Sequence, residues 1–360
     1  MKKNHVLFLA AVLLAAFNVQ VASAKIWRVN NKSNYNGTSL YGDNFGGTAA
    51  YPVFAQINQA VGWANVHNND TLYVEGSTSV YATASITKKL VLIGPGYFLQ
   101  ENPKTSSDLL EANIGQLAFN ISGSQVIGIN NVSSGSFASF YVNVSNITIK
   151  RCKVTNAIEI ASNLSDIYIE QNFFLPSGTA LSTNGSFYVY PIGLYFNNNI
   201  CQKTLLWAGP IQQCNNNIFD GPANALNLQF TTPEFANNIL KPTNASVDIN
   251  AGSKDKISYN VGTLSTQFGT ANSNKVVANI STLFVPSGTT DGQYILKANS
   301  AASNNGSDAT DRGPFGGVVV SNRYTLSGLA GIPAIYKITT SGVATTTSGL
   351  TITISARTIK

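Results

Sequence analysis

The chain has 360 residues, of which 22 are Lys or Arg and 16 are Asp or Glu, so charged residues make up only 11%. That fraction is well below the roughly one quarter that is usual for globular chains. Hydrophobic residues make up 44% and aromatic residues 10%, which excludes a charged disordered tail, a coiled coil and a highly charged nucleic-acid-binding protein. We therefore expect a folded protein with one large core or two smaller ones and no nucleic-acid partner.

The first 24 residues have the pattern of a cleavable signal peptide. Two lysines precede an apolar run over residues 6–17, and an Ala-Ser-Ala sequence ends at Ala24, which is the small-residue pattern that precedes a cleavage site. The run is too short to span a bilayer, and no cysteine follows it to accept a lipid. We predict a signal peptide over residues 1–24 and a mature chain that starts near Lys25, has no transmembrane segment and is secreted or held at the cell surface.

A degenerate repeat runs through the body of the chain. Its reference positions are spaced by a mean of about 22 residues, within the range of repeat folds, and they are Asn130, Cys152, Asn172, Asn199, Asn217, Asn238 and Asn260. An apolar residue stands three positions before each of them. Alternation around a polar residue is typical of two short strands joined by a tight turn, and a column of Asn side chains can pass hydrogen bonds between stacked units. The pattern predicts an all-β fold, a parallel β-helix.

The N-terminal end of this solenoid has a predicted cap. Over residues 51–64, the apolar residues Val53, Ile57 and Val61 recur every four positions, which indicates a short amphipathic helix. Terminal coils need cover against edge pairing, so we expect this helix to lie over the first coil.

The C-terminal region departs from the repeat. A glycine-rich turn occupies residues 308–317, and residues 334–339 and 350–354 alternate as strands do. We predict a β-hairpin that closes the C-terminal end. The predicted division is a β-helix with its cap over residues 25–317 and a β-strand extension over residues 318–360.

Several segments resemble a known group of proteins. Residues 70–74, 92–99 and 311–317, together with the Asn-marked coils, are similar to secreted bacterial proteins of the right-handed parallel β-helix, pectin-lyase-like superfamily. The likeness covers nearly the whole mature chain and implies a right-handed coil. The superfamily includes polysaccharide lyases, glycoside hydrolases and adhesins, so the resemblance by itself leaves the function open.

The first candidate surface follows from this resemblance, because the superfamily's enzymes bind substrate along the outside of the first sheet. Here we expect that sheet to contain the strand before each Asn-bearing strand. The side chains expected to face outward there are Glu159, Tyr188, Tyr190, Asn227, Gln229, Asp248 and Asn250, with Trp207 in an undetermined orientation. Aromatic rings stack on sugar rings, and amides and carboxylates bind hydroxyls, so the strip could bind polysaccharide. The alternative is ordinary polar decoration of a solenoid face.

The second candidate surface contains the densest cluster of charge in the coils. Lys150 and Glu170 each stand two residues before a reference position, and Tyr168 and Tyr195 stand four before theirs. We expect the first two to lie side by side and the two rings to stack. A sulfated or uronic-acid ligand is one interpretation, and an exposed ion pair of little energetic weight is the other.

Catalytic and metal-binding patterns are scarce. Hydrolysis needs two carboxylates about 5–9 Å apart, and Glu159 and Asp248 stand several coils apart in the alignment. The Arg-x-Pro-x-x-Arg, Asp-Asp and Gly-His-Gly signatures of the superfamily's enzymes are absent. The mature chain has one histidine, His67, in a polar turn, and Asp308 with Asp311 fall short of the oxygen ligands that calcium takes. We therefore expect no metal and no cofactor.

The three cysteines are predicted to be unpaired and buried. Cys152 replaces Asn in the column, while Cys201 and Cys214 fall on inward-facing positions beside Phe219 and Phe196. Buried free cysteines behave as small apolar residues.

Two hypotheses about function follow. The first is a secreted or cell-surface β-helix that binds polysaccharide, or serves as a structural or adhesive module, without catalysis. The alternative is a polysaccharide lyase or another carbohydrate-active enzyme, for which Glu159, Tyr188 and Lys150 are the first candidates as acid or base. The sequence assigns no catalytic residue.

Overall fold

The computed structural model describes residues 24–32, 47–133, 135, 137–184, 190–223, 225–286, 288–341, 344 and 349–358. The predicted signal peptide lies outside the described residues except for Ala24. The division of the mature chain at residue 317 stays a prediction.

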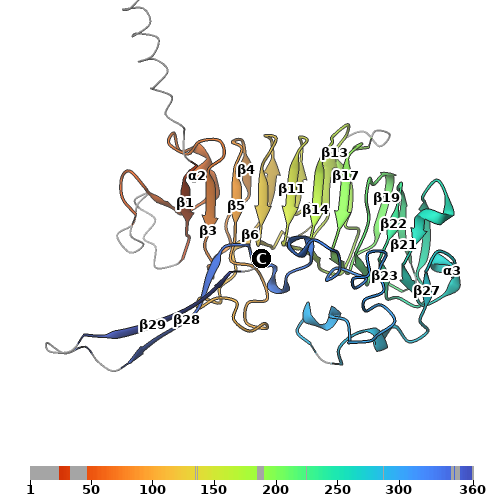
Figure 1. Cartoon of the computed structure of the whole chain (residues 1–360). Helices are drawn as coiled ribbons and strands as arrows, with labels where there is room; N and C mark the ends of the chain where they lie inside the picture. The colour runs from red at the N-terminus through yellow and green to blue at the C-terminus, as the bar shows by residue number, and fades with distance from the viewer. Residues whose placement is uncertain are drawn as a thin grey trace, which may run out of the picture.

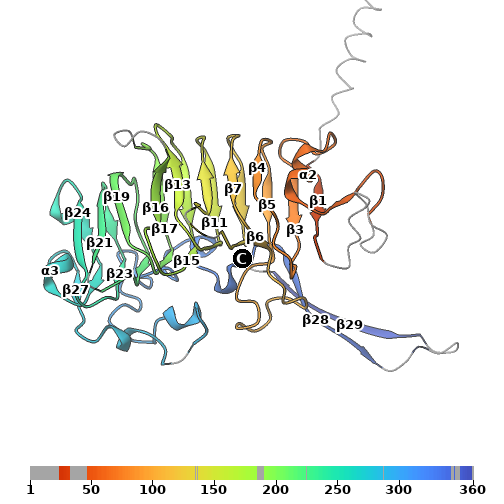
Figure 2. The same ribbon diagram turned by 180° about the vertical axis from the view of Figure 1, so that it is seen from behind.

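The chain forms a right-handed parallel β-helix with three faces, to each of which most coils contribute a strand (Figures 1 and 2). The first sheet has the order β17-β14-β11-β8-β5-β3-β1-β2. Its strands are β1 (Ile26–Val29), β2 (Val53–Phe54), β3 (Thr71–Val74), β5 (Val91–Ile93), β8 (Gln125–Ile127), β11 (Ile147–Lys150), β14 (Ile167–Glu170) and β17 (Leu194–Asn197). An isolated bridge between Tyr195 and Gln213 continues this face toward the paired strands β22 (Phe235–Ala236) and β25 (Ile257–Ser258).

The second sheet consists of two-residue strands. They are β6 (Asn113–Ile114), β9 (Asn130–Asn131), β12 (Lys153–Val154), β15 (Phe173–Phe174), β18 (Ile200–Cys201), β20 (Ile218–Phe219), β23 (Ile239–Leu240), β26 (Val261–Gly262) and β27 (Lys275–Val276).

The third face is divided into two sheets, joined by a bridge between Thr179 and Thr204. The first has β4 (Ala84–Ile86), β7 (Leu117–Phe119), β10 (Phe140–Val142), β13 (Ile158–Ala161) and β16 (Leu181–Asn184), and the second has β19 (Leu205–Pro210), β21 (Leu226–Thr231) and β24 (Ser246–Asn250).

The helices are short. They are α2 (Ile57–Gly62), α3 (Ser265–Phe268) and the 3-10 turns η2 (Lys254–Lys256), η3 (Ile280–Leu283), η4 (Gly292–Tyr294), η5 (Val320–Asn322) and η6 (Leu326–Gly328). The helix α2 lies at the N-terminal end of the solenoid, as expected (Figure 1), but it is shorter than the predicted 51–64 because Val53 belongs to β2 and pairs with Arg28. Among the described residues, no helix is long and apolar enough to cross a membrane.

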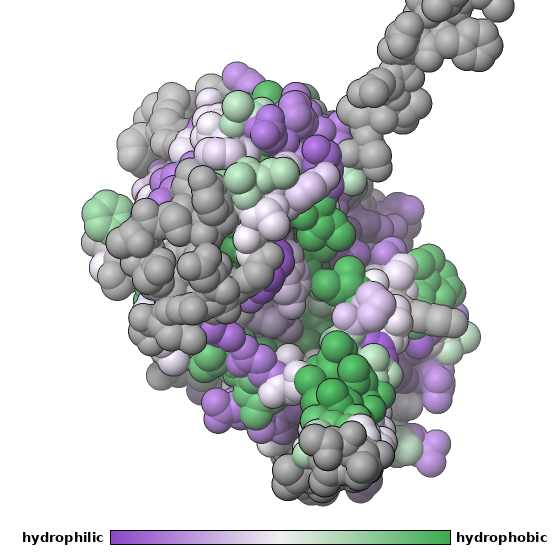
Figure 3. Space-filling view, turned by 90° about the vertical axis from the view of Figure 1, so that its left-hand side faces the viewer, coloured by the Kyte–Doolittle hydropathy of each residue, from purple (hydrophilic) through white to green (hydrophobic). Residues whose placement is uncertain are grey.

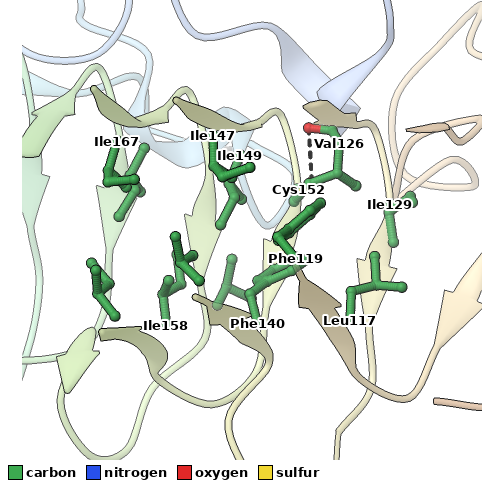
Figure 4. Packing of buried hydrophobic residues seen from close by; sticks show 14 of the residues in the cluster. Leu117, Phe119, Val126, Ile129, Phe140, Ile147, Ile149, Cys152, Ile158 and Ile167 are labelled. Atoms are coloured by element: carbon green, nitrogen blue, oxygen red, sulfur yellow. Dashed lines mark hydrogen bonds between the residues drawn. The ribbon is translucent and has the colours of Figure 1, made fainter. Parts of the chain in front are cut away.

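The core follows from alternation along each strand. In β11 and β14, Ile147 and Ile149 are buried and pair with Ile167 and Ile169, while the residues between them face outward. Figure 4 shows how such side chains from successive coils gather in the interior. Burying one aliphatic side chain contributes about 1.5–3 kcal/mol, so repeating the pattern in each coil stabilises the whole stack.

A ladder of Asn side chains runs along the turn after the first sheet. The Oδ1 atom of each ladder Asn accepts a hydrogen bond from the backbone N–H of the ladder residue in the preceding coil, at 2.8–2.9 Å. Each amide nitrogen except the last donates to the Oδ1 atom of the next Asn. The ladder comprises Asn172, Asn199, Asn217, Asn238, Asn260 and Asn274. The predicted column is therefore present, and Asn274 extends it by one coil.

The prediction was wrong at Asn130, which pairs with Lys153 rather than with Cys152. In this coil the left-handed position of the turn is Gly128 and the next residue is Ile129, so the Asn comes one position too late. Its amide nitrogen donates instead to the side-chain oxygens of Glu111 and Asn113.

After the last coil the chain returns along the solenoid as a strap, defined here as residues 312–332. Arg312 donates to the carbonyl oxygen of Asn260. Further along, the strap's carbonyl groups accept from side chains of earlier coils: Asn198 donates to Pro314 O, Gln171 to Ser321 O and Arg151 to Leu329 O. The strap thus runs antiparallel to the order of the coils.

The predicted C-terminal hairpin is present as β28 (Pro333–Ser341) and β29 (Thr351–Thr358), which pair antiparallel. It does not close the C-terminal end, however, because the strap carries it back to the early coils, where Ser107 N donates to Ile335 O. The hairpin projects from the body there (Figure 1). Ile338, Ile352 and Ile354 are exposed on it, and Figure 3 shows hydrophobic side chains gathered at this end of the molecule.

Candidate functional site

The clearest surface feature is a pair of stacked tyrosines on the first sheet. Tyr168 on β14 pairs in register with Tyr195 on β17, and their ring centroids lie 4.8 Å apart with an interplanar angle of 13°. They face outward because Ile167 and Ile169 of the same strand face the core. The predicted stacking is confirmed.

An ion pair lies beside the tyrosines, with Glu170 two residues after Tyr168 on β14 and Lys150 on the neighbouring strand β11. Lys150 on β11 pairs in register with Glu170 on β14, and Lys150 Nζ lies 3.7 Å from Glu170 Oε2. Partial burial lowers the pKa of Lys150, and the charge of Glu170 acts in the opposite direction. The predicted contact is therefore present, and the negative charge of Glu170 largely offsets the positive charge of Lys150.

A hollow of about 260 Å³ adjoins this pair. Its polar lining includes Glu170, Asn197, Gln213, Asn215, Asp308 and Asn322. Asn197 Nδ2 donates to Gln213 Oε1 at 2.9 Å. The strap forms the opposite wall with Gly316, Gly317, Val318 and Val319, so the hollow exists only because the strap passes over this face. We call the two tyrosines, the ion pair and this hollow the tyrosine face.

The charge of the tyrosine face is predominantly negative. Asp166 precedes Tyr168 by two residues, and partial burial followed by the charge of Asp166 raises the pKa of Tyr168. Glu170 beside Lys150 and Asp308 in the hollow add two further carboxylates to this face. The sulfated or uronic-acid ligand considered from the sequence would meet these carboxylates, and like charges repel.

Glu159 lies elsewhere, on β13 of the third face, whose strands are the ones that were predicted to form the substrate-binding sheet. Burial raises the pKa of its carboxyl, and it lines a hollow of about 200 Å³ with Ser182 and Lys203. Burial lowers the pKa of Lys203, whose Nζ donates to the carbonyl oxygen of Ser177. Among the described residues that line this hollow there is no second carboxylate.

The remaining predicted residues do not form one strip with Glu159. Asp248 is exposed on β24 and accepts from Gln229 Nε2. It lies four strands from Glu159, or roughly 19 Å at the usual strand spacing, in agreement with the expectation that the two are too far apart. Tyr190 packs edge-on against Trp207, with centroids 5.5 Å apart, and Trp207 is buried. Tyr188 lies outside the described residues.

The outward orientation predicted for Asn227 is wrong. Its side chain is fully buried and Nδ2 donates to Pro222 O. The pairing of β21 with β24 shifts between Leu226 and Leu228, and such a β-bulge breaks the strict alternation of the strand.

No candidate metal site is present in the described part of the chain. No group of three His, Cys, Asp or Glu side chains there is arranged so that it could bind a metal ion. His67 is exposed in its turn, and its backbone N–H donates to Asp70. The three cysteines are free and buried, as predicted.

One feature of this region was not predicted from the repeat. The residue before each ladder Asn has a positive φ, at Gln171, Asn198, Asn216, Asn237, Tyr259 and Ser273, and so does Arg151 before Cys152. In this left-handed conformation its side chain leaves the coil at the turn, and most of this column holds the strap or the segment before it. The recurring Asn-Asn pairs are the signal that could have revealed it.

Comparison with protein-family models, with curated proteins and with solved structures found no match to this chain. The class of protein that the fold defines is a single-chain parallel β-helix, and its function must be argued from its surface.

Proposed function

We propose that this chain is a secreted or cell-surface β-helix of the pectin-lyase-like type that binds a polysaccharide on its tyrosine face without cleaving it. The observation that carries this proposal is the stacked pair Tyr168–Tyr195 beside a hollow rich in amide side chains. Rings supply an apolar platform for the C–H faces of sugars, and amides donate to and accept from hydroxyls.

The platform has room for a sugar ring. Thr148 pairs in register with Tyr168 on the side away from Tyr195, and its short side chain leaves that face of the Tyr168 ring uncovered. On the other side, Gln213 follows Tyr195 and brings an amide next to the second ring. A chain of sugars lying along the solenoid axis would meet these groups in succession.

The charges favour a neutral polysaccharide. Glu170 is engaged by Lys150, and the side chain of Asp308 accepts from the N–H and the hydroxyl of Thr310. Because both carboxylates of the hollow already have partners in the fold, they support binding better than acid–base catalysis.

Binding is tested by affinity electrophoresis of the chain from Lys25 in gels that contain neutral polysaccharides or polyuronates. We expect retardation by a neutral polysaccharide and roughly 2- to 13-fold weaker binding in Y168A, since one aromatic contact contributes roughly 0.5–1.5 kcal/mol. The matched control is Y141A, which removes a half-buried tyrosine from β10 on the third face.

Three results would contradict the proposal. Equal losses of binding affinity in Y168A and Y141A would show that the polysaccharide binds away from the tyrosine face. The absence of retardation by every glycan in the panel would contradict a binding function. An unsaturated product seen by ultraviolet absorbance, or new reducing ends, would replace it with the enzyme hypothesis.

A further inference from the structure

A buried carboxylate stands at the start of the solenoid, away from the tyrosine face. Asp70 is 2% exposed. Its Oδ1 atom accepts from the backbone nitrogen of Lys25 at 2.8 Å, and Oδ2 accepts from Trp27 Nε1 at 2.8 Å and from His67 N at 2.9 Å.

No ion pair in the described part of the chain includes Asp70, although the charge of Lys88 interacts with it at longer range. Burial alone would raise the pKa of Asp70, but the hydrogen bonds from His67, Lys25 and Trp27 lower it overall. Asp70 is therefore ionised at neutral pH. A buried charge without an opposite charge is costly, so the position favours a cation.

Lys25 is the residue at which a cation can be created. It follows Ala24, where the small-residue pattern ends, and both residues are exposed. The nitrogen of Lys25 is also fixed in place, because Lys25 O accepts from Thr71 N at 2.8 Å and the pairing of β1 with β3 begins at the next residue, Ile26.

We propose that cleavage between Ala24 and Lys25 produces an α-ammonium group that forms an ion pair with Asp70, so that Asp70 is the receptor of the mature N-terminus. The reaction is a hydrolysis: water adds across the peptide bond, Ala24 leaves as a carboxylate and the Lys25 nitrogen gains protons to become an ammonium. The inference rests on the predicted cleavage and is independent of the proposed glycan binding.

The nitrogen need not move when it becomes charged. It already lies at hydrogen-bond distance from Asp70 Oδ1, and cleavage changes an N–H dipole into a full positive charge at the same place. Charge-assisted hydrogen bonds are roughly twice as strong as neutral ones, so processing should tighten the first coil, in which β1 pairs with both β2 and β3.

The ion pair has a defined pH window. An α-amino group has an ordinary pKa of about 7.7–8.0, and Asp70 should raise the pKa of the Lys25 amine in the folded protein. The contribution of the ammonium group to the stability of the fold is therefore complete below about pH 7.7 and is lost as the pH rises through the raised pKa. The pKa of Asp70 is lowered in the folded protein, so its contribution is present above about pH 4 and is lost as the pH falls.

The other charges near Asp70 do not replace the ammonium. The Lys25 side chain lies over the rings of Trp27 and Tyr51, and Lys88 Nζ donates to Trp63 O. His67 contributes an attractive charge when it is protonated, so the measurements compare two forms of the chain that both keep His67.

The test compares a chain that begins at Lys25 with one that begins at Ala24, each released from a cleavable fusion. The second form keeps an amide at Lys25 and moves the ammonium one residue away. At pH 6 we expect the Lys25 form to have the higher Tm by roughly 1–3 °C. The difference should vanish at pH 10, where the amine is neutral, and in the D70N background. The control D255N changes an exposed aspartate of η2 and should preserve the difference.

A second measurement does not depend on the stability of D70N. The rate at which the α-amino group is acylated is followed by mass spectrometry from pH 6 to pH 10 in both unsubstituted forms. We expect a higher apparent pKa for the amine of the Lys25 form than for that of the Ala24 form. Equal Tm values with equal amine pKa values would overturn the proposal, as would an exported protein whose first residue is not Lys25.

Discussion

Replacing Asn217 with alanine tests how much the Asn ladder contributes to the fold. Asn217 Oδ1 accepts from Asn199 N at 2.9 Å, and Nδ2 donates to Phe196 O and to Asn238 Oδ1. The side chain is fully buried, so no water replaces it. N217A leaves the N–H of Asn199 without a partner, and it removes a donor from Phe196 O and from Asn238 Oδ1. A buried polar group without a partner costs about 1–3 kcal/mol, so we expect a loss of about 4 kcal/mol in the free energy of unfolding.

The assay is urea unfolding followed by far-UV circular dichroism. C152A serves as the comparison within the same column, because Cys152 stands next to the first ladder Asn. Its Sγ donates to the carbonyl oxygens of Lys150 and Val126, and no Asn side chain in the described part of the chain donates to it. We expect C152A to cost at least 2 kcal/mol less than N217A, and N244A, at an exposed Asn outside the ladder, to stay within about 0.5 kcal/mol of the unsubstituted chain. A loss below 1 kcal/mol for N217A would refute the reasoning, because the ladder would then be replaceable by ordinary packing.

Two further predictions concern the thiols and the strap. Burial raises the pKa of Cys152 and Cys201 to about 12 and that of Cys214 well above its usual value. Iodoacetamide at pH 8 should therefore label none of the three cysteines in the folded protein and all three in urea. Labelling before unfolding would contradict their burial. R151M removes the donors to Leu329 O and Ser321 O while keeping much of the apolar stem. Limited proteolysis should therefore cut the strap, residues 312–332, faster than in the control K256A, and equal rates would show that the strap is held by its other contacts.

The sequence was informative wherever the repeat is regular. The stacking of Tyr168 on Tyr195 and the contact of Lys150 with Glu170 followed from equal distances to the reference positions of the repeat, because residues at equal positions in successive coils are neighbours on adjacent strands. The same reasoning failed where one residue is displaced. Asn130 comes one position after the turn that it was expected to occupy, and the β-bulge at Asn227 buries a side chain that alternation places outside.

The hollow beside Tyr195 could not be derived in this way. One wall comes from Asn197 and Gln213 in the coils, and the other comes from Val318 and Val319 in the strap. The strap has no period, so nothing in its residues indicates which coils it crosses. Its path depends on donors such as Gln171 and Arg151, whose side chains turn toward it only because their backbone is left-handed.

The sequence alone therefore determined the class of fold, the ladder and the column neighbours, because a solenoid repeats one local rule in every coil and local alternation decides which side chains enter the core. Only the tertiary structure decided where the return strap and the hairpin lie, which face carries a hollow, and that Asp70 meets the nitrogen of Lys25. Those contacts join residues far apart in the chain, 45 positions for Lys25 with Asp70 and 178 positions for Arg151 with Leu329. Such pairings depend on the path of the whole chain rather than on any pattern within one coil.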